Sequence, residues 1–183
     1  MPSAAMTPQE FWSLVEQTRN SSSEVQANAL SEKLAALGLE GVVAFENHLN
    51  HHISELMSFD HLAANFIIQS YTSDDVFTDF QAWLVMQGKE RFENARDDVE
   101  TIAKWLEPED VEAIDGGVFV TLSVEVYRSL GGDEDEFYDR IRHPDEVEFE
   151  IEWPETRAGF EERLPVLYRK FWNQERVREL HAD

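Results

Sequence analysis

The sequence has no cysteine, few basic residues and no long hydrophobic run. The absence of cysteine from all 183 residues excludes disulfide bonds, thiolate nucleophiles and cysteine-ligated zinc. No apolar stretch approaches the ~20 residues that a membrane-spanning helix needs, and the N-terminal stretch does not have the basic and apolar regions of a secretory signal. We therefore expect a soluble, cytoplasmic protein that does not bind membranes.

The shortage of basic residues leaves a large negative charge. Fifteen Lys and Arg against 38 Asp and Glu give a net charge of −23. Residues 107–155 contain 17 of the acidic residues and only 3 of the basic ones. Such a chain repels nucleic acid and anionic membranes, so we expect neither as a partner. The acidic residues would attract a basic protein partner or bind cations, or they would serve only to keep the chain soluble.

Apolar periodicity predicts an all-α fold. Apolar residues make up 42% of the chain, and its length is typical of one domain with a hydrophobic core. Apolar residues recur at helical spacing in most of the chain, and the sequence shows no repeat and no domain boundary. We expect a single helical domain over residues 1–183, a bundle of about seven to nine helices.

Capping residues mark several helix ends. Thr7 and Glu10 form a capping box around a proline, and Ser23 with Gln26 forms a second capping box. Gly38 is placed to end the second helix. Residues 118–130 combine strand-favouring β-branched residues with helical spacing, and we interpret them as a helix because two glycines follow.

The acidic stretch 133–155 is predicted to be a loop or an extended segment. Near residues 145–153, apolar residues alternate with glutamates, as in a strand. A lone strand needs a partner, so we expect a short extended segment that lies on the helices. The candidate partner surface consists of Glu146, Glu148, Glu150, Glu152 and Trp153. An aromatic anchor inside a charged rim is typical of interfaces, although blocks of like charge are also common as solvated loops.

A second candidate cluster is Ser73, Asp74, Asp75 and Asp79. Ser73 precedes a strongly apolar stretch, where it would cap a helix while Asp74 and Asp75 oppose the positive end of the helix dipole. Alternatively, Asp79 lies one turn beyond Asp75, and three carboxylates could hold Mg²⁺ or Mn²⁺ or perform acid–base catalysis. The helix-start interpretation is favoured because this residue order ahead of an apolar run is the usual one.

Histidines form the third candidate cluster. His48, His51, His52 and Glu55 share one sector of about 100° on a helix. His48 and His52, at i and i+4, could chelate zinc, with Glu55, His61 or a distant acid as third ligand. The sequence lacks the His-Glu-x-x-His order of zinc proteases, and the simpler interpretation is a solvated helix face.

The order of these motifs resembles an uncharacterised bacterial family, the domain of unknown function 4240. The resemblance begins with Phe11-Trp12 and covers residues 9 to about 130. Its most recognisable part is Ser73-Asp74-Asp75, Phe77, Phe80, Trp83-Leu84 and Gln87-Gly88. The resemblance implies an all-helical fold, and it implies no activity, cofactor or site residue. The glutamate-rich stretch 145–155 departs from the family pattern.

No motif for catalysis is present. The sequence contains no glycine-rich phosphate loop and no Gly-x-Ser-x-Gly element. We therefore expect a protein-binding or regulatory module with no catalytic activity and no cofactor. The alternative is a metal-dependent hydrolase that binds a divalent metal through the Asp cluster or the His pair.

Overall fold

The computed structural model describes residues 6–144 and 148–180, and in these ranges it contains helices and no strand. The predicted all-α fold is confirmed. The described residues form eleven α-helices and two 3-10 helices, more than the seven to nine predicted, because residues 117–180 are divided into helices of at most eight residues. None of the described helices is both long and apolar enough to cross a bilayer.

The elements follow the chain in three groups. The first group is α1 (Pro8–Thr18), α2 (Ser23–Ser54), α3 (Phe59–Gln69), α4 (Asp74–Val85) and α5 (Lys89–Asp97). The second is η1 (Val99–Lys104), η2 (Pro108–Ala113), α6 (Gly117–Val120) and α7 (Leu122–Ser129). The third is α8 (Glu134–Arg140), α9 (Arg157–Arg163), α10 (Pro165–Phe171) and α11 (Gln174–Leu180).

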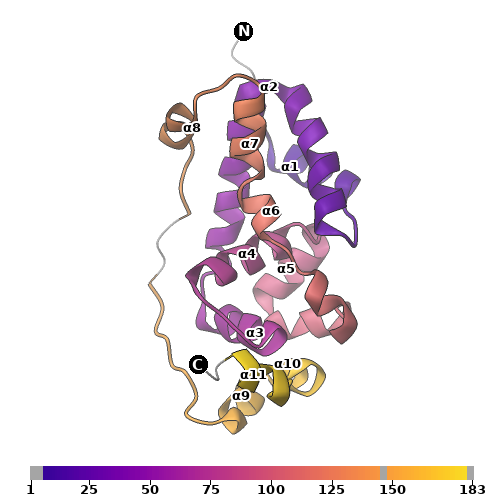
Figure 1. Cartoon of the computed structure of the whole chain (residues 1–183), viewed down its shortest axis with the longest axis vertical. Coiled ribbons are helices and arrows are strands. Elements are labelled where there is room, and N and C mark those ends of the chain that lie inside the picture. Colours follow the sequence, from indigo (N-terminus) through magenta and orange to yellow (C-terminus); the bar gives the residue numbers. More distant parts are fainter. Residues whose placement is uncertain (1–5, 145–147, 181–183) are drawn as a thin grey trace.

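The long helix α2 folds back on itself at Gly38. The backbone there has φ +71°, a conformation that glycine adopts without strain, so the predicted helix break is confirmed. Both ends of α2 lie on α4. The Gln26 side chain donates to the Met86 carbonyl at 2.9 Å, and the Gln81 side chain donates to the Ile53 carbonyl at 3.4 Å. The two halves of α2 therefore run side by side in opposite directions (Figure 1).

The predicted capping residues are confirmed with one exception. Thr7 and Glu10 make both bonds of the capping box at the start of α1. The second helix is capped by Ser22, whose hydroxyl accepts from the Val25 N–H, and not by Ser23. The sequence prediction was one residue late because Ser23 is already buried in the first turn.

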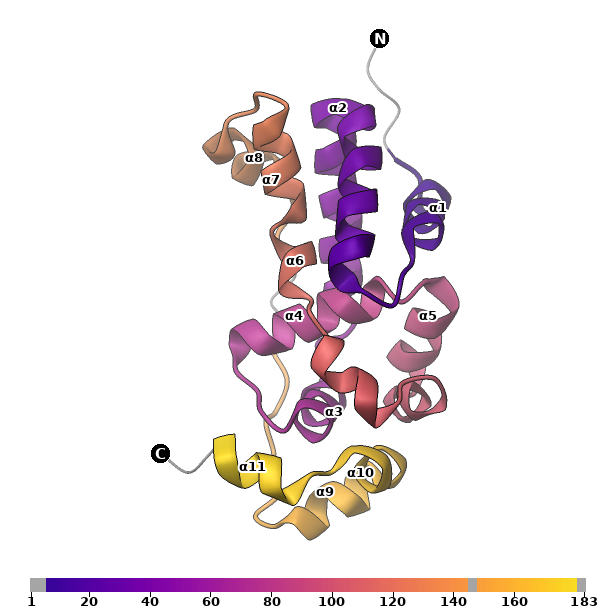
Figure 2. The ribbon, with the colours of Figure 1, turned by 45° about the vertical axis from the view of Figure 1, so that its right-hand side comes forward.

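Other helices surround the α2 hairpin and bury its apolar faces. Helices α1 and α7 pack on opposite sides of it, and α4 crosses its base (Figure 2). The predicted helix over 118–130 is confirmed as α6 and α7. The core contains fully buried aromatic rings from all of these layers, namely Phe11, Phe45, Phe80, Phe119 and Tyr127.

The C-terminal part returns to the core at the other end of the molecule. After α8, the chain runs along one side to α9–α11, which lie beside α3 (Figure 1). Aromatic rings hold this part in place. The Trp153 ring lies 5.5 Å from that of Phe66 and 5.9 Å from that of Phe160, measured between centroids. Residues 148–154 therefore lie against the helical core, without regular secondary structure of their own.

Candidate functional site

The first turn of α4 contains the first candidate cluster. Ser73 is the N-cap of α4, and its hydroxyl accepts from the Val76 N–H at 3.3 Å. Asp74 and Asp75 follow in the first turn, where the partial positive charge of the helix terminus stabilises their carboxylates. The local geometry is therefore that of an ordinary acidic helix start.

Asp74 also lines a groove of about 690 Å³ between α4 and the acidic C-terminal segment. Five apolar side chains line it, namely Met57, Leu62, Phe77, Phe149 and Ile151. Three carboxylates line the same groove, those of Asp74, Glu148 and Glu150, together with the neutral Thr78 and Gln81. The structure thus brings together residues from two clusters that are distant in the sequence.

The chemistry of the groove follows from this lining. None of the described residues that form it is a Lys, Arg or His, so nothing in the groove neutralises the three carboxylates. An apolar surface next to carboxylates suits a side chain that has an aliphatic stem and a cationic end, which means Lys or Arg. The groove is therefore suited to a basic segment.

The outer side of the acidic segment is exposed. Glu148, Glu150 and Glu152 all lie at the surface, and 57% of Ile151 and 42% of Trp153 are accessible to solvent. Residues 148–153 have no regular secondary structure, and Glu146 lies outside the described residues. Within the stretch 133–155 that was predicted to be a loop or extended segment, Glu134–Arg140 instead form the helix α8, which the Asp133 side chain caps. Apolar and acidic side chains alternate at this surface, and both kinds are available to a partner.

Asp79 does not belong to the groove. It faces α6, where a Cβ atom on Gly117 would lie 3.3 Å from the Asp79 carboxylate. Burial raises the pKa of Asp79, and the neighbouring carboxylates of Asp115 and Asp75 raise it further. Asp74, Asp75 and Asp79 do not form a compact set of ligand atoms. Among the described residues, three potential metal-ligand atoms lie within 4.8 Å of one another at His51, His52 and Glu55.

The histidine cluster differs from the predicted ligand set. His48 is already engaged, because its Nε2 lies 2.8 Å from the carbonyl oxygen of Met6. His61 is buried with both ring nitrogens in use, one with the Ser58 hydroxyl and the other with the Ala95 carbonyl. Neither is placed to complete a site with His52 and Glu55.

His52 is packed between aromatic rings, whereas the sequence favoured a solvated helix face for this residue. It is 9% exposed, and its ring centroid lies 4.7 Å from that of Trp12 and 5.0 Å from that of Phe92. Its Nδ1 lies 2.6 Å from Glu55 Oε2. Burial lowers the pKa of His52, and the bond with Glu55 offsets this only in part. Burial thus favours the neutral form of the imidazole.

These residues border a second cavity, of about 820 Å³. Four of the five histidines in the described part of the chain line it, namely His48, His51, His52 and His143. Sequence reasoning did not select His51 as a ligand or bring His143 to this cavity. The i, i+4 spacing of His51 and Glu55 was a usable signal for His51, whereas the approach of His143 depends on the path of the chain after α8.

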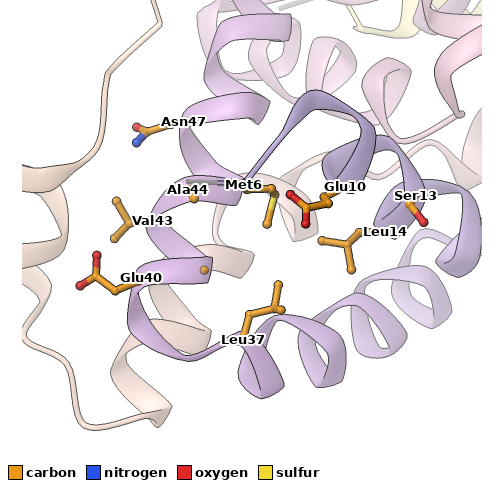
Figure 3. A pocket seen from close by; sticks show the side chains of 10 residues that line it. Met6, Glu10, Ser13, Leu14, Leu37, Glu40, Val43, Ala44 and Asn47 are labelled. Carbon is orange, nitrogen blue, oxygen red and sulfur yellow. The ribbon is translucent and has the colours of Figure 1, made fainter. Parts of the chain in front are cut away.

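A third cavity, of about 550 Å³, lies between α1 and α2. The side chains of Met6, Leu14 and Leu37 point toward one another across it (Figure 3). The acids at its border are engaged elsewhere. Glu10 belongs to the capping box, and Glu40 accepts a hydrogen bond from Arg140 at 2.6 Å. This cavity therefore has a mixed apolar and polar lining, and both acids in it are engaged in other contacts.

Comparisons with known proteins give one match. No curated protein and no solved structure matches the chain. Residues 6–129, more than half of the chain, match the family described as "Protein of unknown function (DUF4240)". The match includes α1 to α7 and therefore Asp74, Phe77 and the histidine cluster, whereas the acidic segment lies beyond it.

Proposed function

The chain belongs to the DUF4240 family, and from the geometry of its groove we propose that it is a protein-binding module for a basic segment of a partner protein. The family description assigns no activity, so the proposal depends on the residues of this chain. The binding site is the groove between the first turns of α4 and residues 148–151.

The observation that carries the proposal is the lining of the groove. Asp74, Glu148 and Glu150 stand beside an apolar surface, and no described basic side chain lines the same groove. In a chain of net charge −23, three unneutralised carboxylates repel one another and the surrounding acids. A Lys or Arg side chain that enters the groove relieves this repulsion and packs its stem on Phe77 and Phe149.

The charge also decides the class of partner. A nucleic acid would present phosphates to these carboxylates, which is unfavourable, so the partner is a basic protein or peptide. Ile151 is an exposed part of the groove lining, and exposed Trp153 extends the contact surface beyond the groove. Aromatic anchors of this kind commonly provide much of the binding energy, while the charged rim provides specificity and fast association.

Only part of the groove lies in the residues that match the family. Asp74 and Phe77 lie within the matched residues 6–129, whereas Glu148 and Glu150 lie beyond them. The shared helical domain thus provides one wall of the groove, and the C-terminal segment of this chain provides the other. We infer that the C-terminal segment sets which basic partner is bound.

The experiment is a binding titration with a fluorescein-labelled arginine-rich peptide, followed by anisotropy. The test variant is Asp74→Asn/Glu148→Gln/Glu150→Gln. The matched control is Glu24→Gln/Glu32→Gln/Glu90→Gln, which makes the same change in net charge at three other exposed positions. We expect the test variant to lose affinity by about tenfold or more and the control by about twofold or less, with wild-type binding weaker at high salt.

Equal losses in the two variants would show that the peptide responds only to net charge. Affinity that does not depend on salt would show that the carboxylates do not make the contact. Either result contradicts the proposal.

A further inference from the structure

We propose that His51, His52 and Glu55 form a binding site for a divalent transition metal of the zinc type. The site lies at the C-terminal end of α2 and is separate from the groove at α4. One potential ligand atom from each residue lies within 4.8 Å of the other two, and these residues are the set of three with this property among the described ranges.

The distances fit a metal after small movements. Four-coordinate zinc with bonds of about 2.0–2.2 Å places its ligand atoms about 3.3 Å apart. Glu55 Oε2 lies 2.6 Å from His52 Nδ1 and 3.9 Å from His51 Nε2, one shorter and one longer than this separation. The His51 side chain is 66% exposed, so its ring can move toward the other two ligands without disturbing the core.

The carboxylate and the buried imidazole are already oriented. Glu55 uses its two oxygens for different contacts, with Oε2 toward the histidines and Oε1 held by Arg96 at 3.0 Å. Arg96 is held in turn by Asp97 at 2.9 Å. The His52 ring is confined by the Trp12 and Phe92 rings. These contacts hold the carboxylate and the imidazole in a fixed orientation before a metal binds.

The ligand types decide the class of metal. Two imidazoles and one carboxylate suit Zn²⁺ and related transition ions, whereas Mg²⁺ and Ca²⁺ prefer sites made of oxygen ligands. Three protein ligands leave a fourth position for water, and the cavity of about 820 Å³ borders all three residues. An open fourth position is the arrangement of catalytic zinc sites, while structural sites use four protein ligands.

The site also differs from the one that helical spacing alone would choose. His48 and His52 stand at i and i+4, but the Nε2 of His48 is bonded to the Met6 carbonyl. If His48 bound a metal through Nε2, this hydrogen bond would break. The Nε2 atom of His51 faces Glu55, which belongs to the same proposed ligand set. His51 and His48 lie one turn apart on α2, so substitution of His48 is a matched control for substitution of His51.

The experiment is a Co²⁺ titration of the tag-free full-length protein, read by absorption spectroscopy, followed by displacement with Zn²⁺. We expect saturable binding of one Co²⁺ per chain and displacement by Zn²⁺ but not by Mg²⁺ or Ca²⁺. His51→Gln should weaken binding by about tenfold or more. His48→Gln should change it by about twofold or less, because His48 lies outside the ligand set. Circular dichroism would verify that both variants remain folded.

Several results would overturn the proposal. Absence of saturable Co²⁺ binding would remove the site. Equal weakening by His48→Gln and His51→Gln would move the metal to another ligand set, and unchanged binding in His51→Gln would exclude His51. Displacement of Co²⁺ by Mg²⁺ or Ca²⁺ at similar concentration would show only unspecific attraction of cations to an acidic surface.

Discussion

The side-chain amide of Asn50 donates a hydrogen bond to the backbone carbonyl of Arg142, at 2.9 Å. One turn earlier on α2, the side-chain oxygen of Asn47 accepts from the Arg142 backbone N–H. Two side-chain amides of α2 thus bind both the backbone N–H and the backbone carbonyl of Arg142. This double contact fixes the start of the segment that leads from α8 to α9 (Figure 1).

Asn50→Ala should release this segment. The variant loses the hydrogen bond to the Arg142 carbonyl and the contact of Asn50 with the Glu46 carboxyl, and we expect a fall of about 1–2 kcal/mol in the free energy of unfolding. Hydrogen exchange measured by mass spectrometry should rise mainly in residues 141–144 and 148–153, while α4 keeps its protection. Faster exchange of the whole domain to the same degree would contradict a local role of Asn50.

A buried carboxyl lies on the same face of α2. Glu46 is 7% exposed, and burial raises its pKa from 4.5 to about 7, while contacts with Ser123 and Asn50 lower it only in part. The folded state therefore binds this proton more tightly than the unfolded state does. The protonated carboxyl is favourable to folding below pH 4.5, and this advantage is lost as the pH rises from 4.5 to about 7.

Glu46→Gln should remove this pH dependence. At pH 5 the variant should be only slightly more stable, by about 1 kcal/mol or less, since the folded carboxyl is still neutral and only the unfolded one has begun to ionise. At pH 8 the variant should be more stable, by about 3 kcal/mol as an upper figure from the pKa shift. Urea denaturation at the two pH values measures the difference. An equal difference at both would show that Glu46 does not titrate as described.

The tight contact between α6 and α4 gives a steric prediction. A Cβ atom on Gly116 would lie 1.6 Å from the Asp79 carbonyl oxygen, whereas one on Gly117 would meet the end of the Asp79 side chain at 3.3 Å. Gly116→Ala should therefore lower the free energy of unfolding by about 2–3 kcal/mol, because backbone must move. Gly117→Ala, as the control, should have a smaller effect. Similar values for the two would contradict the close approach.

Helix starts were the part of the fold that local sequence predicted best. The Thr7 capping box and the Ser73 cap depend on residues within one turn, so the sequence contains all of the relevant information. The approach of Asp74 to Glu148 depends on how the chain returns after α8, and no local pattern encodes it. The sequence could not predict the proposed ligand set with His51 for the same reason. His48 is excluded from it by a bond with the Met6 carbonyl, which is a tertiary contact between residues distant in the sequence.

Ser73 and Asp74 should have separable roles. Ser73→Ala loses the cap of α4 and should lower the free energy of unfolding by about 1 kcal/mol without changing affinity for the arginine-rich peptide. Asp74→Asn should cost less stability, at most about 1 kcal/mol, and should weaken peptide binding. Urea denaturation and anisotropy titration of the two variants measure both quantities. A loss of affinity in Ser73→Ala equal to that in Asp74→Asn would show that the first turn matters only for folding.

The central claim is that the arginine-rich peptide binds in the groove between α4 and residues 148–151, and the methyl group of Met57 can report on it. Met57 lines the groove, Met6 lines the two other cavities, and Met86 is fully buried. The measurement is a titration of methionine-methyl ¹³C-labelled protein with the arginine-rich peptide, followed by NMR. The account predicts that the Met57 methyl signal moves with peptide concentration while those of Met6 and Met86 stay in place. Binding that leaves the Met57 signal unchanged, or that moves the Met6 signal equally, would contradict it.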